Sequence, residues 1–311
     1  MAAQPKGEPL ADAHRHRWSV AGFGLDVGRP VMQQSCAACG LERTIPAWDR
    51  TWIPPPRWRL VPSGHAAVAG RLLAPVLALG RLDRMTGSIR VDVWSDVACP
   101  WCYIGKRNLE AGIAAYRAAD AGRPPVEVEY HSFELAPDTP VDFEGSELDY
   151  LARVKGIGVD EARRLLDRVS GIAAGVGLHY DFASVKHTRT VKAHQVLHFA
   201  NARGLQRETA ERLFSAYFVE GRHLGRDEEL AELAGEVGLD GADVLRSLRA
   251  DEHLADVRAD QQQAIGYGIR GVPFFVIDAA YGLSGAQPPE TFAAALAQVA
   301  AERVAIPERA S

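Results

Sequence analysis

Residues 89–105, IRVDVWSDVACPWCYIG, carry the strongest structural signal in the chain. Residues 89–94 alternate apolar and polar side chains and are rich in β-branched residues, which predicts a β-strand. Cys99 and Cys102 follow with the spacing C-x-x-C, and Pro100 between them suits the first turn of a helix, where its missing N–H is not needed. The stretch therefore predicts a strand, a short connection and the start of a helix.

Regular elements continue outward from this stretch. Helical spacing over residues 102–119 and alternation over 126–133 predict a helix and a second strand. Residues 144–266 are almost wholly helical in pattern, with seven candidate helices and glycines at their ends, as expected of C-caps. Two short strands and a last helix are predicted over 274–277, 281–284 and 290–303. A C-x-x-C pair that follows a strand and opens a helix is typical of a thioredoxin-like fold.

The order of the elements gives the predicted fold class, an α/β thioredoxin fold interrupted by an inserted all-helical domain. Residues 86–140 and 267–304 are assigned to the discontinuous thioredoxin-like domain, and residues 141–266 to the inserted domain. Residues 1–85 are an irregular N-terminal extension, with short β-like pieces at 18–20 and 41–45.

Composition excludes several classes of protein. The chain has 311 residues, enough for about two domains, and 47% hydrophobic and 24% charged residues, an ordinary globular balance. A net charge of −5 argues against nucleic acid as a partner. No segment reaches the roughly 18 apolar residues of a membrane helix, and the first 25 residues lack the apolar block of a secretory signal. We therefore expect a cytoplasmic protein, in which a C-x-x-C pair is more often catalytic or metal-binding than structural.

The two cysteines after the first strand have different expected roles. At the N-terminus of a helix, unpaired backbone N–H groups and the helix dipole stabilise a thiolate, which favours Cys99 as the nucleophile. Cys102, one turn later, is expected to be more protected and to resolve the mixed disulfide. The alternative is that both cysteines are ligands of a zinc site. Trp101 between them either covers the disulfide or is a packing aromatic.

Val272 and Pro273 precede a predicted strand. In a thioredoxin-like fold a cis proline at this place lies beside the nucleophilic sulfur and presents a backbone edge to the substrate. An ordinary trans proline at a strand start is the alternative. The position of Pro273, after the C-x-x-C pair and the helical insertion, favours the cis form.

Four stretches of the chain belong to one known pattern: VDVWSDVACPWCYIGKRNLE (91–110), YHSFEL (130–135), KAHQVLHFA (192–200) and GIRGVPFFVIDAAYGLSGAQPPETF (268–292). Together they resemble the DsbA family of thiol–disulfide oxidoreductases, specifically its FrnE-like cytoplasmic subgroup, over residues 89–300. The resemblance implies a thioredoxin fold interrupted by a helical domain. It also implies Cys99 as nucleophile, Cys102 as resolving thiol and Pro273 as the cis proline.

Other polar residues near the motif have two interpretations each. Asp96 either serves proton transfer or caps a turn. His131 and Glu134 follow the second strand, where one of them is a candidate base facing Cys102, although Glu134 is expected to face solvent. His194 either lines the substrate groove or is a structural histidine. Lys106 and Arg107, in the second turn of the redox helix, are expected to be solvated.

Cys36 and Cys39 form a second C-x-x-C pair in the N-terminal extension. With a following glycine and β-like flanks, the pair resembles a zinc-ribbon knuckle, for which His14 and His16 are candidate ligands. The pair is otherwise a redox partner of the first one, or inert. Met85 stands just ahead of the first regular strand, so a misassigned start codon is a further hypothesis for residues 1–84.

Three functions compete. The leading one is a dithiol–disulfide oxidoreductase that acts on protein or small-molecule disulfides, needs no cofactor beyond its redox-active disulfide and accepts glutathione as a candidate co-substrate. A glutathione-dependent isomerase or kappa-class transferase on the same fold is the second, but those enzymes commonly have a serine and no second cysteine in the motif. A non-catalytic metal-binding module is the third. A homodimer is expected from the family alone.

Overall fold

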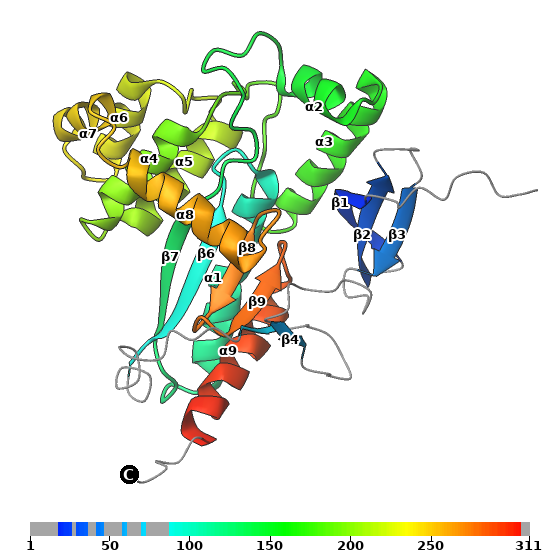
Figure 1. The fold of residues 1–311 in the computed structure, drawn as a ribbon, viewed down its shortest axis with the longest axis vertical. Coiled ribbons are helices and arrows are strands. Elements are labelled where there is room, and N and C mark those ends of the chain that lie inside the picture. The colour runs from blue at the N-terminus through cyan, green and yellow to red at the C-terminus, as the bar shows by residue number, and fades with distance from the viewer. Residues whose placement is uncertain are drawn as a thin grey trace, which may run out of the picture. The chain divides into compact units, whose positions relative to one another are not determined.

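The computed structural model of the chain describes residues 18–26, 29–36, 42–46, 58–60, 70–72 and 87–305. It divides into two compact units, Met1–Ile53 and Pro54–Ser311, each with a sheet of its own (Figure 1). None of the described helices is both long and apolar enough to cross a membrane.

The first unit contains a three-stranded antiparallel sheet in the order β1-β2-β3. Its strands are β1 (Trp18–Asp26), β2 (Arg29–Cys36) and β3 (Glu42–Pro46). The β-like pieces expected at 18–20 and 41–45 fall within β1 and β3 or at their edge. Cys36 ends β2, whereas Cys39, Met85 and both candidate histidines lie outside the described residues. The zinc and start-codon hypotheses therefore stay predictions.

The second unit is built on a six-stranded sheet in the order β4-β5-β9-β8-β6-β7 (Figure 1). Its central strands are those that the sequence predicts: β6 (Ile89–Ser95), β7 (Val126–Ser132), β8 (Phe274–Ile277) and β9 (Tyr281–Ser284). β6 runs parallel to β7 and antiparallel to β8, and Trp94 pairs with Phe274. This register brings the residue after Pro273 beside the strand that leads to Cys99.

Two short strands extend this sheet beyond the predicted elements. β4 (Trp58–Leu60) pairs with β5 (Gly70–Leu72), and β5 pairs with β9 through Arg71 and Tyr281. Three residues are too few for an alternating pattern to be visible, so the sequence carries no signal for them. The sheet thus includes residues from the segment before Met85.

Helix α1 (Pro100–Ala119) begins at the cysteine motif and packs against α9 (Pro289–Ala305). The helices approach closely at Gly112, where a Cβ atom would lie 2.6 Å from the Cβ of Phe292. Only glycine fits at such a contact. The predicted boundaries of both helices are confirmed within a few residues.

Seven helices stand between β7 and β8 in the chain, as the sequence predicts. They are α2 (Glu147–Lys155), α3 (Val159–Ala174), α4 (Val191–Asn201), α5 (Gln206–Phe218), α6 (Asp227–Glu236), α7 (Gly241–Arg249) and α8 (Leu254–Tyr267). Three of them, α4, α5 and α8, contact β7, so the helical segment covers the strand beside the one that leads to the cysteines (Figure 1). The fold is the predicted α/β thioredoxin fold with a helical insertion, while the exact domain limits stay a prediction.

Candidate active site

The two cysteines of the C-x-x-C pair lie where β6 gives way to α1. Cys99 is the N-cap residue of α1, with an extended backbone, and its N–H donates to the carbonyl of Asp96 over 3.0 Å. The N–H of Cys102 donates to the carbonyl of Cys99 over 2.9 Å. Both are free thiols and both are buried, with exposed fractions of 4% for Cys99 and 2% for Cys102. Cys102 is the more protected, as expected, but by a small margin.

The loop before β8 lies against the first thiol. The Val272–Pro273 peptide bond is cis, as the sequence predicts. The Sγ of Cys99 lies 3.7 Å from the carbonyl oxygen of Val272 and donates a hydrogen bond to it. Residues 173 positions apart in the chain thus form one site, in which a main-chain edge runs beside the candidate nucleophile.

Gly105 permits this contact between α1 and the proline loop. A Cβ atom at this position would lie 2.9 Å from the Cγ of Pro273 and 3.2 Å from the Cζ of Phe275. A proline ring is rigid and cannot swing aside, so the helix and the loop would have to separate. The sequence gives no sign of this role of Gly105, because a glycine inside a helical pattern does not show which residues it packs against.

Gly105→Ala is therefore expected to destabilise the protein by about 1–3 kcal/mol, the usual result of overpacking. Gly235→Ala is the matched control, because Gly235 also lies in a helix and a Cβ atom there meets nothing within 4 Å. The control is expected to be neutral or slightly stabilising. Urea unfolding measures the stability of both variants. Equal behaviour of the two variants would contradict the close contact at Pro273.

Aromatic side chains from the helical segment cover the start of α1. The hydroxyl of Tyr180 donates to the carbonyl of Pro100 over 2.7 Å. Tyr103 stacks on Phe214, with ring centroids 4.9 Å apart, and Trp101 is partly buried against the same core. The predicted packing role of Trp101 is thus observed, and its effect on access to the disulfide stays a prediction. Nothing local in the sequence marks Tyr180 as a neighbour of the motif.

Burial also decides the protonation of the second thiol. Removal from water raises the pKa of Cys102 well above its ordinary value, and the neighbouring Cys99 adds to the effect. The side chain of Ser95 and the backbone of Asp96 favour the thiolate, but they do not offset the burial. Cys102 therefore rests as a thiol and must lose a proton before it can act as a nucleophile.

Asp96 is buried just ahead of the motif. Its carboxylate accepts hydrogen bonds from the N–H of Ala98, over 3.2 Å, and of Leu135, over 2.7 Å. Burial alone would raise the pKa of Asp96, but His194 and these two N–H groups hold it below the ordinary value. The predicted turn-capping role of Asp96 is confirmed, since its carboxylate joins the loop before Cys99 to the loop after β7.

His131 is a structural group rather than a base facing Cys102. Its Nδ1 lies 2.8 Å from Asp260 and its Nε2 lies 2.9 Å from Asp92, so both ring nitrogens are engaged. The ring stacks on Trp94 at 4.5 Å. Burial would lower the pKa of His131, but the two carboxylates raise it to about 9. The sequence hypothesis of a base at His131 is therefore wrong.

Glu134 does not face solvent, contrary to expectation. Only 1% of its side chain is exposed, and it accepts hydrogen bonds from Arg189 and Gln261, which come from the helical segment. Lys106 is likewise buried rather than solvated, because its ammonium pairs with Glu110 and Glu211. In both cases a partner distant in the sequence compensates the charge, and a local pattern cannot reveal such a partner.

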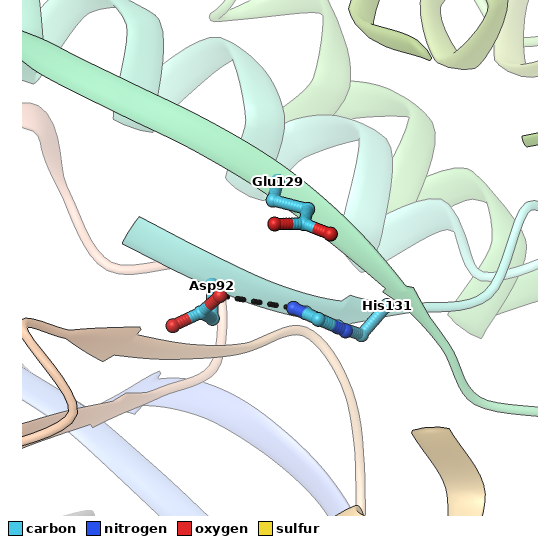
Figure 2. A group of neighbouring side chains, drawn as sticks. All are labelled: Asp92, Glu129 and His131. Atoms are coloured by element: carbon cyan, nitrogen blue, oxygen red, sulfur yellow. Dashed lines mark hydrogen bonds and ion pairs between the residues drawn. The ribbon is translucent and has the colours of Figure 1, made fainter. Parts of the chain in front are cut away.

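One group of side chains has the composition of a metal site. Asp92, Glu129 and His131 hold ligand-type atoms within 4.8 Å of one another, and Figure 2 shows the contact between Asp92 and His131. The guanidinium of Arg90 already bridges the two carboxylates, at 2.7 Å from each. The Arg90 guanidinium thus supplies the positive charge between the two carboxylates, and we assign no metal site to this group.

Comparison with known proteins identifies the family. The model of the DSBA-like thioredoxin domain matches residues 90–297. The chain belongs to the DSBA-like thioredoxin family. The predicted resemblance to the DsbA family over residues 89–300 is thereby confirmed, while the FrnE-like subgroup stays a prediction, and the first 89 residues lie outside the match.

Two proteins similar to this chain support the family assignment. The crystal structure of the probable DsbA oxidoreductase from Streptomyces coelicolor is 40% identical, with a TM-score of 0.63, over 69% of this chain and 91% of that one. The uncharacterized protein YwbO from Bacillus subtilis is 31% identical over 61% of this chain and 87% of its own length. The structure of a 2-hydroxychromene-2-carboxylate isomerase, 16% identical, covers 70% of this chain and 98% of that one with a TM-score of 0.51, a likeness that shows the fold alone.

Proposed function

We propose that the protein is a dithiol–disulfide oxidoreductase in which Cys99 is the nucleophile and Cys102 the resolving thiol. The observation that carries this proposal is the contact between Cys99, at the first turn of α1, and the carbonyl of Val272 in the cis-proline loop. Membership of the DSBA-like family supports the same class of chemistry. As part of the same proposal, we place this activity in the cytoplasm.

The proposed cycle uses two exchanges. The thiolate of Cys99 attacks one sulfur of a substrate disulfide, which breaks the S–S bond, releases one substrate thiolate and forms a mixed disulfide. Cys102 then loses its proton and attacks the Sγ of Cys99. The Cys99–Cys102 bond forms, the second substrate thiolate leaves, and the enzyme dithiol is oxidised by two electrons while the substrate is reduced. The same steps in reverse oxidise a dithiol substrate.

The position of the two thiols supports this division of labour. Cys99 is the N-cap residue, at the positive end of the dipole of α1, and its Sγ contacts the carbonyl of Val272. Cys102 lies one turn inside the helix, and burial raises its pKa. The reduction potential of the couple, measured against glutathione, decides whether the enzyme works as a reductase or an oxidase.

Cys102→Ser tests the proposal. Without the resolving thiol, insulin reduction is expected to fall about 10²-fold or more, because the two cysteines act as one catalytic unit and loss of either one stops turnover. The variant is also expected to accumulate a mixed disulfide at Cys99, visible as a mass increment that dithiothreitol removes. Normal turnover by Cys102→Ser would replace this proposal with a monothiol mechanism, of the glutathione-transferase type.

A further inference from the structure

Tyr180 lies in the loop between α3 and α4 and reaches the cysteine motif from the helical segment. Its hydroxyl donates a hydrogen bond of 2.7 Å to the carbonyl of Pro100. Pro100 follows Cys99 and is the first residue of α1, so this contact falls inside the C-x-x-C pair itself. The helical segment is thereby connected directly to the turn that carries both thiols.

Aromatic neighbours hold the ring of Tyr180 in place. The ring packs on Phe218, with centroids 4.7 Å apart, and makes an edge-to-face contact with Phe182 at 5.5 Å. It also stacks on Tyr103 at 6.2 Å, and the hydroxyl of Tyr103 donates to Glu211 over 2.7 Å. These contacts involve the ring alone, so a variant that lacks only the hydroxyl of Tyr180 keeps all of them.

The hydroxyl of Tyr180 is a neutral donor. Burial raises the pKa of Tyr180 above its ordinary value of 10.0, and the field of the neighbouring Cys99 raises it further. The phenol therefore stays protonated, and the carbonyl of Pro100 can only accept. The hydrogen bond thus always polarises the peptide unit between Pro100 and Trp101 in the same direction.

This peptide unit also carries the N–H of Trp101, the second residue of α1. The first N–H groups of a helix have no partner within the helix, and those of its second and third residues are the usual donors to an N-cap side chain. The N–H of Cys102, the third residue, is turned to the carbonyl of Cys99 over 2.9 Å. The N–H of Trp101 is therefore the donor left for the side chain of Cys99. In the thiol form the Sγ of Cys99 makes no such bond and donates to Val272 instead.

We propose that Tyr180 is a positioning residue that favours the reduced form of Cys99 through the peptide between Pro100 and Trp101. The inference rests on the proposed function. Hydrogen bonds in a chain polarise one another, so a donor on the carbonyl of a peptide makes its N–H a stronger donor. The N–H of Trp101 receives the sulfur of Cys99 as a thiolate, when it attacks a disulfide and when it leaves the mixed disulfide in the reverse direction. Tyr180 acts through the peptide and takes no part in the exchange of bonds.

The equilibrium of the Cys99–Cys102 pair with glutathione measures this effect. The enzyme is equilibrated with known ratios of glutathione and its disulfide, and the dithiol and disulfide forms are counted by mass after alkylation of free thiols. Tyr180→Phe removes one oxygen atom. It is expected to shift the equilibrium constant about three- to tenfold towards the disulfide form, the size of one neutral hydrogen bond.

Tyr116→Phe is the matched control. Tyr116 also lies in α1 and also donates to a proline carbonyl, that of Pro124, but beyond the other end of the helix. Its loss is expected to leave the equilibrium with glutathione unchanged, because a contact that only supports the fold stabilises both redox forms equally. An unchanged equilibrium in Tyr180→Phe, a shift towards the dithiol form, or an equal shift in both variants would overturn the inference.

Failure of the proposed function has a different result. A wild-type enzyme that formed no disulfide between Cys99 and Cys102 at any ratio of glutathione to its disulfide would overturn the proposed function. A wild-type enzyme that forms this disulfide, with an equilibrium constant that Tyr180→Phe does not change, would overturn only the role of Tyr180.

Discussion

Cys99→Ser is expected to abolish the first exchange step, and with it all thiol–disulfide turnover. The remaining thiol, Cys102, is buried and its pKa is raised, so at neutral pH it offers little thiolate to an external disulfide. Insulin reduction should fall to the uncatalysed rate, a loss of about 10²-fold or more. The variant should also form no adduct at Cys102 with dithiobis(nitrobenzoate), a chromogenic disulfide, in the time that the wild-type enzyme takes to react with it.

The comparison with Cys102→Ser separates the two roles. In Cys102→Ser, Cys99 should still attack the reagent and the reaction should stop at the mixed disulfide. Cys99→Ser should lose this first attack. The two sulfurs are almost equally buried, so the difference between them rests on their positions at the start of α1 and one turn inside it. An adduct that formed rapidly on Cys102 in Cys99→Ser would reverse the assignment.

Local patterns predicted most of the fold. The alternation at 89–94, Pro100 at the start of α1 and the glycines between helices are properties of neighbouring residues, and they determined the elements from β6 to α9. The same patterns do not show which other parts of the chain bury a helix or strand. Asp92 alternates with apolar residues as a solvent-facing position should, yet it is buried, because Arg90 and His131 satisfy its carboxylate.

The candidate site was predictable where its residues lie in one motif, and not where the fold assembles them. Cys99 and Cys102 share a motif, and Pro273 has a recognisable place before a strand. Gly105, Tyr180 and the partners of Glu134 gain their roles only from segments about 55 to 170 positions away. No periodicity in one sequence encodes such pairings, so these residues emerged only from the structure.

His131 shows the same limit in its electrostatics. A histidine after a strand near a cysteine motif is a reasonable base by composition, but two carboxylates from separate elements, Asp92 in β6 and Asp260 in α8, hold it as a cation. Asp260 also accepts a hydrogen bond from the N–H of Ser132 and lies 3.0 Å from His198. These contacts fasten α8 and α4 of the helical segment to the strands beside the active site.

Asp260→Asn is expected to destabilise the protein by about 1–3 kcal/mol, because His131 and the N–H of Ser132 lose a charged partner while Asp92 still pairs with His131. The control is Asp256→Asn, on the same helix, where the carboxylate is half exposed and pairs with His253. An exposed pair of this kind contributes about 0–1 kcal/mol. Urea unfolding at pH 6 measures both variants, and equal losses would contradict a special role of Asp260.

The pH dependence of stability identifies the ionised pair as the cause of that loss. The pKa of His131 is raised from 6.5 to about 9, so its contribution is fully present below pH 6.5 and disappears as the pH rises through 9. The pKa of Asp260 is lowered, so its contribution is present above its ordinary value of 3.8 and disappears as the pH falls below it. A pKa rise from 6.5 to about 9 corresponds to roughly 3 kcal/mol. The wild type should therefore lose up to that amount between pH 6.5 and 9, and Asp260→Asn should lose less. A wild-type stability that stayed flat over this range would show that His131 is not held as a cation in the folded protein.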